Sequence, residues 1–588
     1  MREPHRDHRP QGTPDRRPRV VRALAAALAA LALTAPSACS SLIGLPSSGT
    51  IRAFSPVEKQ TRRVYTSPAG PTDDDQPEGI VEGFFNAMPA GVQSDGYRVA
   101  REYLTSSAAD TWRGDDSAIV YDGAPSFVRK TIPLASSAST GSIIVEAEMN
   151  VIGRLDEYGL FTPTDAEDPV TMSFTMSKVD GQWRISGLDD GVAVSSADFE
   201  QAFRQVSVYR VDAPGRHLVP DVRWFSWRNW RTQAVRAVLS DGISWLGDAV
   251  KDLGTEKVAL AVNTVPIESN VPHVQLGRGF LGLGDDERAL IVHLIRLTLG
   301  DGVDSASLKV TVDGNDYSNI DGDVGLDTQQ PSVGIYTLTD GRIVSLGSSS
   351  PLRVGETKGF DDALGFAFSA NGGAVLRADG VAECLKADAS SCGVMFGGAR
   401  LSSIASGLDG EIWAVAADGR SLYVSREGVS RRLTPAWLAD GVIRSVSVSS
   451  EGARLALAMG DGGVRLTGIV RDDDQTPAAL AERSTQVSRR RGVTMVTFYN
   501  DLNLVYATSP VDGNGRSTEQ QAFRQIVPGP DTVQRLPDTA VVALASGQIA
   551  LYRRLAVLDD LGIVRSVSGS LDGSWSIADS QVTALGAQ

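Results

Sequence analysis

A single cysteine, Cys39, stands at the end of an apolar run, where its thiol could be modified. Arginines are frequent in residues 16–22, an Ala/Leu run fills 23–35, and small residues then lead to Cys39. A positive end, an apolar middle and a small-residue junction form the layout of a secretory signal. The run is too short for a bilayer, which takes roughly 20 apolar residues. The pattern predicts removal of residues 1–38 and attachment of lipid to the Cys39 sulfur. Pro36 stands where such junctions usually carry leucine, so an ordinary secreted protein cleaved nearby stays an alternative.

The other two cysteines, Cys384 and Cys392, are eight positions apart. In an exported chain such a pair predicts a local disulfide, with two buried thiols as the alternative. The histidines outside the leader, His217, His273 and His293, lie far apart and lack metal-ligand spacing. The sequence therefore predicts no metal site and no cofactor.

Residues 277–282 match G-x-G-x-x-G, the glycine pattern of a dinucleotide site. In such a site a continuous apolar strand precedes the glycines and the following helix opens on the pyrophosphate. Here two acids, Asp285 and Asp286, begin that helix and would repel phosphate, so we interpret the glycines as a turn. The acidic stretches at 313–317 and 321–323 lack the spacing of a calcium loop. The sequence also contains no GxSxG, HExxH or CxxC, so no motif points to an enzyme.

The net charge of the chain is −15. Residues 1–38 hold seven arginines and three acids, so the leader carries +4 and the mature chain about −19. An acidic surface argues against nucleic acid, whose phosphates need Lys and Arg, and against electrostatic adhesion to anionic lipid. Firm attachment to a membrane would therefore depend on several acyl groups at Cys39.

Residues 39–76 are rich in Ser, Gly, Pro and Asp and cannot bury a core, so they predict a flexible tether. In residues 77–204, the apolar positions from Ile80 to Met88 have helical spacing, whereas 143–151 and 170–176 read as strands. Helices followed by an antiparallel sheet predict a small α+β domain.

Residues 205–330 predict a second small α+β domain. The expected elements are a hairpin at 206–220, a helical run from Gln233 to Leu253, strands at 258–262 and 271–276, a helix that opens at Asp285, and a strand at 307–314. The acids at the start of the Asp285 helix suit the positive end of its dipole.

Residues 331–588 consist of short strands and turns that repeat. Each repeat has an apolar strand, a turn with Asn, Asp or Glu before glycine, and a second strand, as at 334–343, 366–375, 404–413 and 446–455. Gly372 to Gly410 is 38 positions and Gly410 to Gly452 is 42. A period of roughly 40 to 50 residues with several strands per repeat predicts propeller blades, about six in this length. The fold class is therefore multidomain α+β and all-β: two small α+β domains followed by a β-propeller.

Several segments recur in one family in this order: Cys39–Leu42, Leu45–Ser48, Ser177–Ile185, Val219–Arg223, Gly277–Gly279 and Val310–Gly314. With these segments, nearly the whole mature chain resembles the LpqB family of actinobacterial lipoproteins. Members combine a lipidated cysteine, an N-terminal α+β domain, a GerMN domain and a C-terminal propeller-like region. The resemblance implies a GerMN-like domain at 205–330 and carries over Cys39 as the lipid-attachment site, but no catalytic residue.

The same family is associated with the sensor kinase MtrB of the MtrA/MtrB two-component system. The resemblance thus implies a non-enzymatic lipoprotein on the outer face of the cytoplasmic membrane, which modulates the extracellular part of such a histidine kinase and so cell-envelope and division processes. Two alternatives stay open: a lipoprotein that binds a solute or cell-wall fragment, and a wall hydrolase. Aromatic rings and carboxylates in the propeller channel would favour the first of these.

Overall fold

The computed structural model describes residues 68–587, apart from 133–141, 165–168, 241–244, 254–257, 304–305, 321, 323, 327–333, 347–358, 370–371, 389, 439–440, 461, 509–519 and 550–551. The chain divides into two units, and everything described belongs to the second, residues 53–588. Within the described residues no helix is long and apolar enough to cross a membrane. The predicted lipid-attachment site, Cys39, lies outside them.

The N-terminal part packs helices on a six-stranded sheet of order β5-β4-β2-β1-β6, with β3 added beside β2. Helix α2 (Pro77–Ala90) begins with a proline in its first turn, where no intrahelical N–H is needed, and carries Glu78 at its positive end. Its buried residues Ile80, Phe84 and Met88 join the core beneath the sheet. The other elements are η1 (Gly91–Asp95), α3 (Arg98–Glu102), α4 (Ser106–Thr111), β1 (Ala118–Ile132), β2 (Ser142–Leu155), β3 (Phe161–Pro163), β4 (Val170–Val179), β5 (Gln182–Gly187), β6 (Val192–Ser195) and α5 (Ser196–Ala202).

The middle part joins a two-stranded hairpin to a small sheet covered by helices. Strands β7 and β8 pair antiparallel from Phe203 to Ser226, while β10 and β11 pair parallel in a sheet of order β12-β11-β10-β9. The bounds are β7 (Phe203–Val211), β8 (Leu218–Ser226), α6 (Trp230–Val238), η2 (Gly247–Ala249), β9 (Ile267–Glu268), β10 (Val271–Leu276), η4 (Arg278–Gly282), α7 (Asp285–Leu299), β11 (Lys309–Val312) and β12 (Asn315–Asp316).

Two expectations for this part were wrong in extent. The helical run predicted from Gln233 to Leu253 is helical in α6 only as far as Val238, and η2 is a single short turn. Trp245 and Leu246, which supplied the later part of the apolar pattern, are buried in a cluster with propeller residues instead. The strand expected at 258–262 is reduced to one bridge between Leu260 and Leu276.

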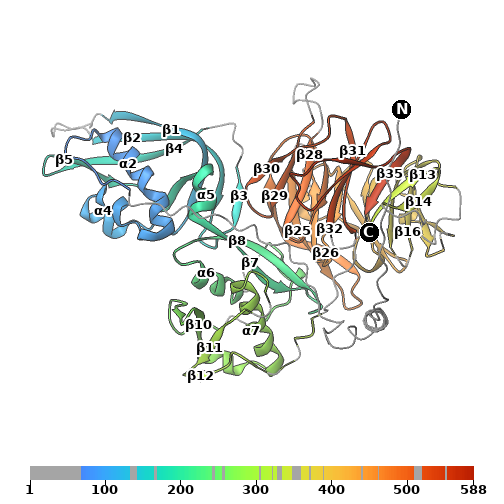
Figure 1. Ribbon diagram of the computed structural model, residues 1–588, viewed down its shortest axis with the longest axis horizontal. Coiled ribbons are helices and arrows are strands. Elements are labelled where there is room, and N and C mark those ends of the chain that lie inside the picture. The colour runs from blue at the N-terminus through green and yellow to red at the C-terminus, as the bar shows by residue number, and fades with distance from the viewer. Residues whose placement is uncertain are drawn as a thin grey trace, which may run out of the picture. The chain divides into compact units, whose positions relative to one another are not determined.

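The C-terminal part is a propeller of six sheets in the described residues, five with four strands and one with three (Figure 1). We number the blades in chain order: blade 1, β13 (Ile335–Thr339), β14 (Arg342–Ser345) and β35 (Val582–Ala587); blade 2, β15 (Ala363–Ser369), β16 (Gly372–Arg377), β17 (Ala382–Lys386) and β18 (Ser391–Val394); blade 3, β19 (Leu401–Ser406), β20 (Ile412–Ala416), β21 (Leu422–Arg426) and β22 (Val429–Leu433); blade 4, β23 (Ser445–Val448), β24 (Arg454–Ala458), β25 (Val464–Arg471) and β26 (Pro477–Ser488); blade 5, β27 (Val493–Phe498), β28 (Asn503–Thr508), β29 (Ala522–Ile526) and β30 (Asp531–Gln534); blade 6, β31 (Val541–Ile549), β32 (Tyr552–Asp559), β33 (Val564–Ser568) and β34 (Ser576–Asp579). Short 3-10 turns, η5 (Phe396–Gly398), η6 (Leu408–Gly410) and η7 (Ala436–Leu438), lie between strands.

The predicted fold class, two small α+β domains followed by a propeller, is confirmed.

The last strand of the chain closes the ring. β35 pairs with β13, so the inner strand of blade 1 is made by the C-terminus and its next strand by residues about 245 positions earlier. Backbone hydrogen bonds also join consecutive blades. In two of them, the carbonyl of a glycine in the turn between the second and third strands of one blade accepts the N–H of the first residue in the inner strand of the next blade. Gly380 accepts from Leu401 at 2.8 Å, and Gly562 accepts from Val582 at 2.9 Å across the closure.

Candidate functional site

The inner strands of the propeller enclose a cavity of about 540 Å³. Residues of β19, β23, β27, β31 and β35, with Phe366 of β15, line it. Because these strands run in the same direction, the cavity has two ends, which we call the N-terminal mouth and the C-terminal mouth after the strand ends that surround them. Its charged lining residues are Asp409, Arg444 and Arg553, and its aromatic ones are Phe366 and Phe498.

Hydroxyl groups dominate the polar lining, and several of them join neighbouring blades. Ser445 and Ser447 each accept a backbone N–H of β27 with their Oγ atoms, at 3.1 Å. Ser546 of blade 6 donates to the carbonyl of Phe498 in blade 5. Ser406 of blade 3 donates at 2.5 Å to the carbonyl of Ala587 in blade 1, beyond blade 2. These hydroxyls satisfy backbone groups that the blades leave unpaired where they meet, so much of the channel's polarity serves the fold.

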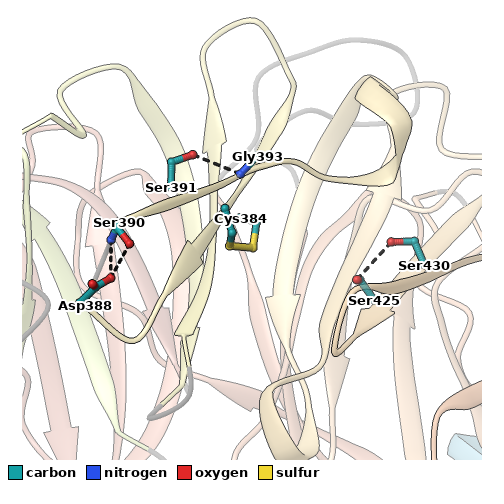
Figure 2. Close-up of a disulfide and its surroundings, with 8 residues drawn as sticks. Cys384, Asp388, Ser390, Ser391, Gly393, Ser425 and Ser430 are labelled. Carbon is teal, nitrogen blue, oxygen red and sulfur yellow. Dashed lines mark hydrogen bonds between the residues drawn. A yellow bond between two sulfur atoms is a disulfide. The ribbon is translucent and has the colours of Figure 1, made fainter.

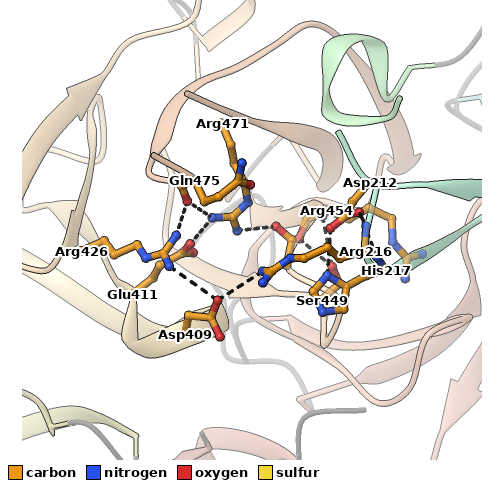
Figure 3. Close-up of polar contacts among 11 residues, drawn as sticks. Asp212, Arg216, His217, Asp409, Glu411, Arg426, Ser449, Arg454, Arg471 and Gln475 are labelled. Atoms are coloured by element: carbon orange, nitrogen blue, oxygen red, sulfur yellow. Dashed lines mark hydrogen bonds and ion pairs between the residues drawn. The ribbon is translucent and has the colours of Figure 1, made fainter. Parts of the chain in front are cut away.

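A charged junction joins the turn of the β7–β8 hairpin to blades 3 and 4 (Figure 3). Asp212 caps this turn, because its carboxylate accepts the N–H of Arg216 at 2.6 Å and lies 2.8 Å from Nδ1 of His217. Arg216 then reaches Asp409 at the C-terminal mouth of the channel, at 3.5 Å, where Arg426 also approaches within 3.6 Å. Both cations are thus directed at the one carboxylate that lines the cavity.

A buried pair supports this junction from within blades 3 and 4. Glu411, with no exposed surface, binds Arg471 and accepts the indole N–H of Trp413 at 3.1 Å. Burial raises the pKa of Glu411, and the attraction of Arg471 opposes that rise only in part. Since buried charges are stable only when paired, both groups hold their positions through each other.

The hairpin itself carries a second buried ionic group. Asp221 is fully buried and binds Arg223 at 2.8 Å and Arg210 at 3.6 Å. Burial alone would raise the pKa of Asp221, but the two guanidinium groups outweigh it and the pKa is lowered. The next contact leads to the propeller, because Arg454 of β24, fully buried and paired with Glu451 at 2.6 Å, reaches the carbonyl of Pro220 at 3.4 Å.

Apolar contacts complete the joint between hairpin and propeller. Trp224 of β8 packs against Phe199 in a tilted arrangement, with ring centroids 4.8 Å apart, and donates its indole N–H to the carbonyl of Pro528 in blade 5 at 2.9 Å. Leu246 lies so close to β25 that a Cβ on Gly468 would stand 2.4 Å from its carbonyl oxygen. Glycine is therefore needed at 468 for the two backbones to approach.

Family comparisons agree with this architecture. A model described as "Lipoprotein LpqB, N-terminal domain" matches residues 70–200, and one described as "Lipoprotein LpqB beta-propeller domain" matches 386–576. A relative from Bifidobacterium longum (strain NCC 2705), "Lipoprotein LpqB", is 56% identical over 577 residues, which are 97% of this chain and 100% of the relative. The chain belongs to the LpqB lipoprotein family.

More distant LpqB proteins share less of the sequence. The "Lipoprotein LpqB" of Cutibacterium acnes (strain DSM 16379 / KPA171202) is 26% identical over 503 residues, 78% of this chain and 79% of that protein. Among solved structures, a virginiamycin B lyase from Staphylococcus aureus aligns with a TM-score of 0.28 and 15% identity over 37% of this chain and 69% of the lyase. A likeness of that size carries no information about activity. The resemblance to the LpqB family seen in the sequence is confirmed.

Among the residues singled out in the sequence of this LpqB chain, His217 belongs to the charged junction, and the other described ones lie apart from it. Cys384 and Cys392 are joined in a disulfide on the outer strands of blade 2, β17 and β18 (Figure 2). The G-x-G-x-x-G stretch forms the short turn η4, where Arg278 binds Asp313 at 2.6 Å. His217 belongs to the junction, whereas His273 bonds Thr311 at 2.9 Å in the middle part.

His293 lies on α7 and is half-buried. Among the described residues, no group of three or more His, Cys, Asp or Glu could hold a metal ion.

Apart from His217, the residues of the junction were not singled out in the sequence, and neither was the buried pair of Asp221 and Arg223. For the buried pair a signal was available in the run Leu218–Ser226, in which Asp221 and Arg223 interrupt mostly apolar residues. An acid and a base two positions apart in a strand share a face. Charged groups within an apolar strand indicate a buried pair, and here every residue of β8 after Leu218 is buried.

Proposed function

We propose that this chain is a non-enzymatic accessory lipoprotein, anchored through Cys39 to the outer face of the cytoplasmic membrane, that modulates the extracellular part of a sensor histidine kinase of the MtrB kind. Through that kinase it would act on cell-envelope and division processes. The observation that carries the proposal is that polar groups lining the cavity are bound to other parts of the chain. Asp409, its lining carboxylate, is held by two arginines, and lining hydroxyls bond to the backbones of neighbouring blades. This is the arrangement of a scaffold rather than of a reaction site.

The alternative as a binder of solutes or cell-wall fragments has less support. Sugar and peptide fragments of the wall would be expected to bind aromatic rings and free carboxylates, but the cavity offers two phenylalanines and one paired carboxylate. Thermal-shift measurements with purified wall fragments test this alternative. The other alternative, a wall hydrolase, is tested by zymography with the purified chain.

The proposal is tested with the kinase in proteoliposomes and the full lipidated chain inserted beside it. A modulator changes a partner's state only through different affinities for its two states, so the rate of kinase autophosphorylation is expected to change and then saturate as the chain is added. A Cys39→Ser chain, which lacks the anchor, is the matched control and is expected to need a higher concentration for the same effect. A rate that stays constant at saturating chain, with no binding to the kinase, contradicts the proposal.

A further inference from the structure

The two mouths of the channel differ in whether their charged side chains form ion pairs. At the C-terminal mouth, Asp409 is paired with two arginines, and Arg553 lies 3.8 Å from Asp501 and donates to the carbonyl of Tyr499 at 3.1 Å. At the N-terminal mouth stands Arg444, the residue before β23, which is exposed and makes no ion pair with any described residue. Of the charged side chains that line the cavity, this cation alone has no partner within the described part of the chain.

Hydroxyl groups line the cavity together with Arg444. Ser445 accepts the N–H of Val496 at 3.1 Å, so its own hydroxyl hydrogen is left for another acceptor. Ser403 and Thr494, on the inner strands of blades 3 and 5, also line this half of the cavity. Among the described residues that line the cavity, Asp409 is the only carboxylate, and it belongs to the opposite end. A guanidinium among hydroxyls is the environment that a carboxylate prefers.

Apolar side chains are exposed on the same face of the propeller. Val542 lines the cavity at the start of β31 and is 54% exposed. Leu561 lies in the turn before Gly562, which bonds to the start of β35, and is 72% exposed. Leu364, at the start of β15, is 62% exposed. These three side chains come from blades 6 and 2, on either side of the closing blade, whereas Arg444 comes from blade 4. An occupant would therefore meet aliphatic surface on one side and a cation on the other.

We propose that the N-terminal mouth is a docking site for an extended segment of a protein partner that carries a carboxylate flanked by aliphatic side chains. The carboxylate binds Arg444 and the hydroxyls beside it, and the aliphatic groups cover Val542 and Leu561. This inference rests on the proposed function, since it names the surface through which the kinase would be recognised. The C-terminal mouth does not offer a free cation in the same way, because Arg216 of the hairpin and Arg426 of blade 3 are both paired with Asp409 there.

The test measures the affinity of the full chain, in detergent, for the extracellular domain of the kinase by biolayer interferometry. An Arg444→Glu chain is compared with an Arg420→Glu chain. Arg420 is the matched control, because it is an exposed arginine in the turn between the second and third strands of blade 3, on the same face but outside the cavity. Reversal at 444 is expected to weaken binding at least tenfold, whereas reversal at 420 is expected to change it less than twofold. Equal effects of the two reversals overturn the docking site.

A second arm separates this inference from the proposed function. If the wild-type chain does not bind the kinase domain, the proposed function fails, and the site is then probed with capped tripeptides. Acetyl-Leu-Glu-Leu-amide is expected to bind the wild-type chain at least tenfold more tightly than acetyl-Leu-Gln-Leu-amide, and this difference is expected to vanish in Arg444→Glu. Binding that does not distinguish Glu from Gln, or no binding of either peptide, overturns the docking site itself.

Discussion

Trp224 is the side chain whose replacement should show most directly how the hairpin is held to its neighbours. It is 1% exposed, packs against Phe199, and donates its indole N–H to the buried carbonyl of Pro528. Removing a buried tryptophan side chain costs about 3–5 kcal/mol, so we expect a loss of about that size for Trp224→Ala. Trp224→Phe keeps much of the apolar contact but leaves the Pro528 carbonyl unpaired, which costs about 1–3 kcal/mol.

Urea denaturation, monitored by circular dichroism, measures these losses of stability. Limited proteolysis is carried out as a second, separate experiment. Because a chain with several domains need not unfold in one step, the proteolysis shows whether the contact to the propeller opens before the domains unfold. We expect both variants to be cleaved earlier near residue 225, and Trp224→Ala also to unfold at lower urea.

Trp575 provides the control for this experiment. Its indole N–H also donates to a backbone carbonyl, that of Arg535 at 3.0 Å, but the bond is exposed. Water can replace an exposed bond, so Trp575→Phe is expected to cost at most about 1 kcal/mol. Equal losses for Trp224→Phe and Trp575→Phe would show that the buried bond to Pro528 does not hold the hairpin, and would refute the reasoning.

Three further changes test the other contacts. Arg454→Met, which leaves Glu451 buried without its cation, is expected to cost about 3–5 kcal/mol in urea denaturation, and adding Glu451→Leu is expected to recover part of that loss. The double change Cys384→Ser and Cys392→Ser removes a short cross-link and is expected to lower the stability of the propeller by about 2–3 kcal/mol, whereas dithiothreitol should then have no further effect. The lowered pKa of Asp221 means that its contribution to stability is complete above its unfolded pKa of 3.8 and is lost as pH falls through the folded value. An Asp221→Asn chain should therefore lose less stability than wild type between pH 5 and pH 2 in thermal unfolding; an equal or greater loss contradicts the assignment.

The repeats of the propeller were visible in sequence because the same turn recurs in consecutive blades. The glycines at 372, 410 and 452 all lie just after the innermost strands of blades 2, 3 and 4. The turn at Asp340-Gly341 looks similar but joins β13 to β14, which are not the innermost strands of blade 1. Local pattern could not show this difference, because the innermost strand of that blade comes from the other end of the region.

Long-range contacts explain the remaining misses. The strand β1 was not predicted, because its register shifts between Asp122 and Ser126 and the alternation of apolar residues breaks there. Trp245 and Leu246 were counted toward a helix, since periodicity records that a residue is apolar but not which part of the chain will bury it. The junction was missed for the same reason: Arg216 and Asp409 are paired across almost two hundred positions of sequence.

The closure of the ring by β35 has a consequence for export. If the chain is exported leader first, as the proposed anchor at Cys39 requires, β35 would emerge after the strands of blades 2 to 6, and blade 1 would lack its inner strand until then. Until β35 is in place, the edge of β13 that it covers is open to pairing with another strand. A stop codon that removes only the six residues of β35 would thus damage the propeller far more than the length of the deletion suggests.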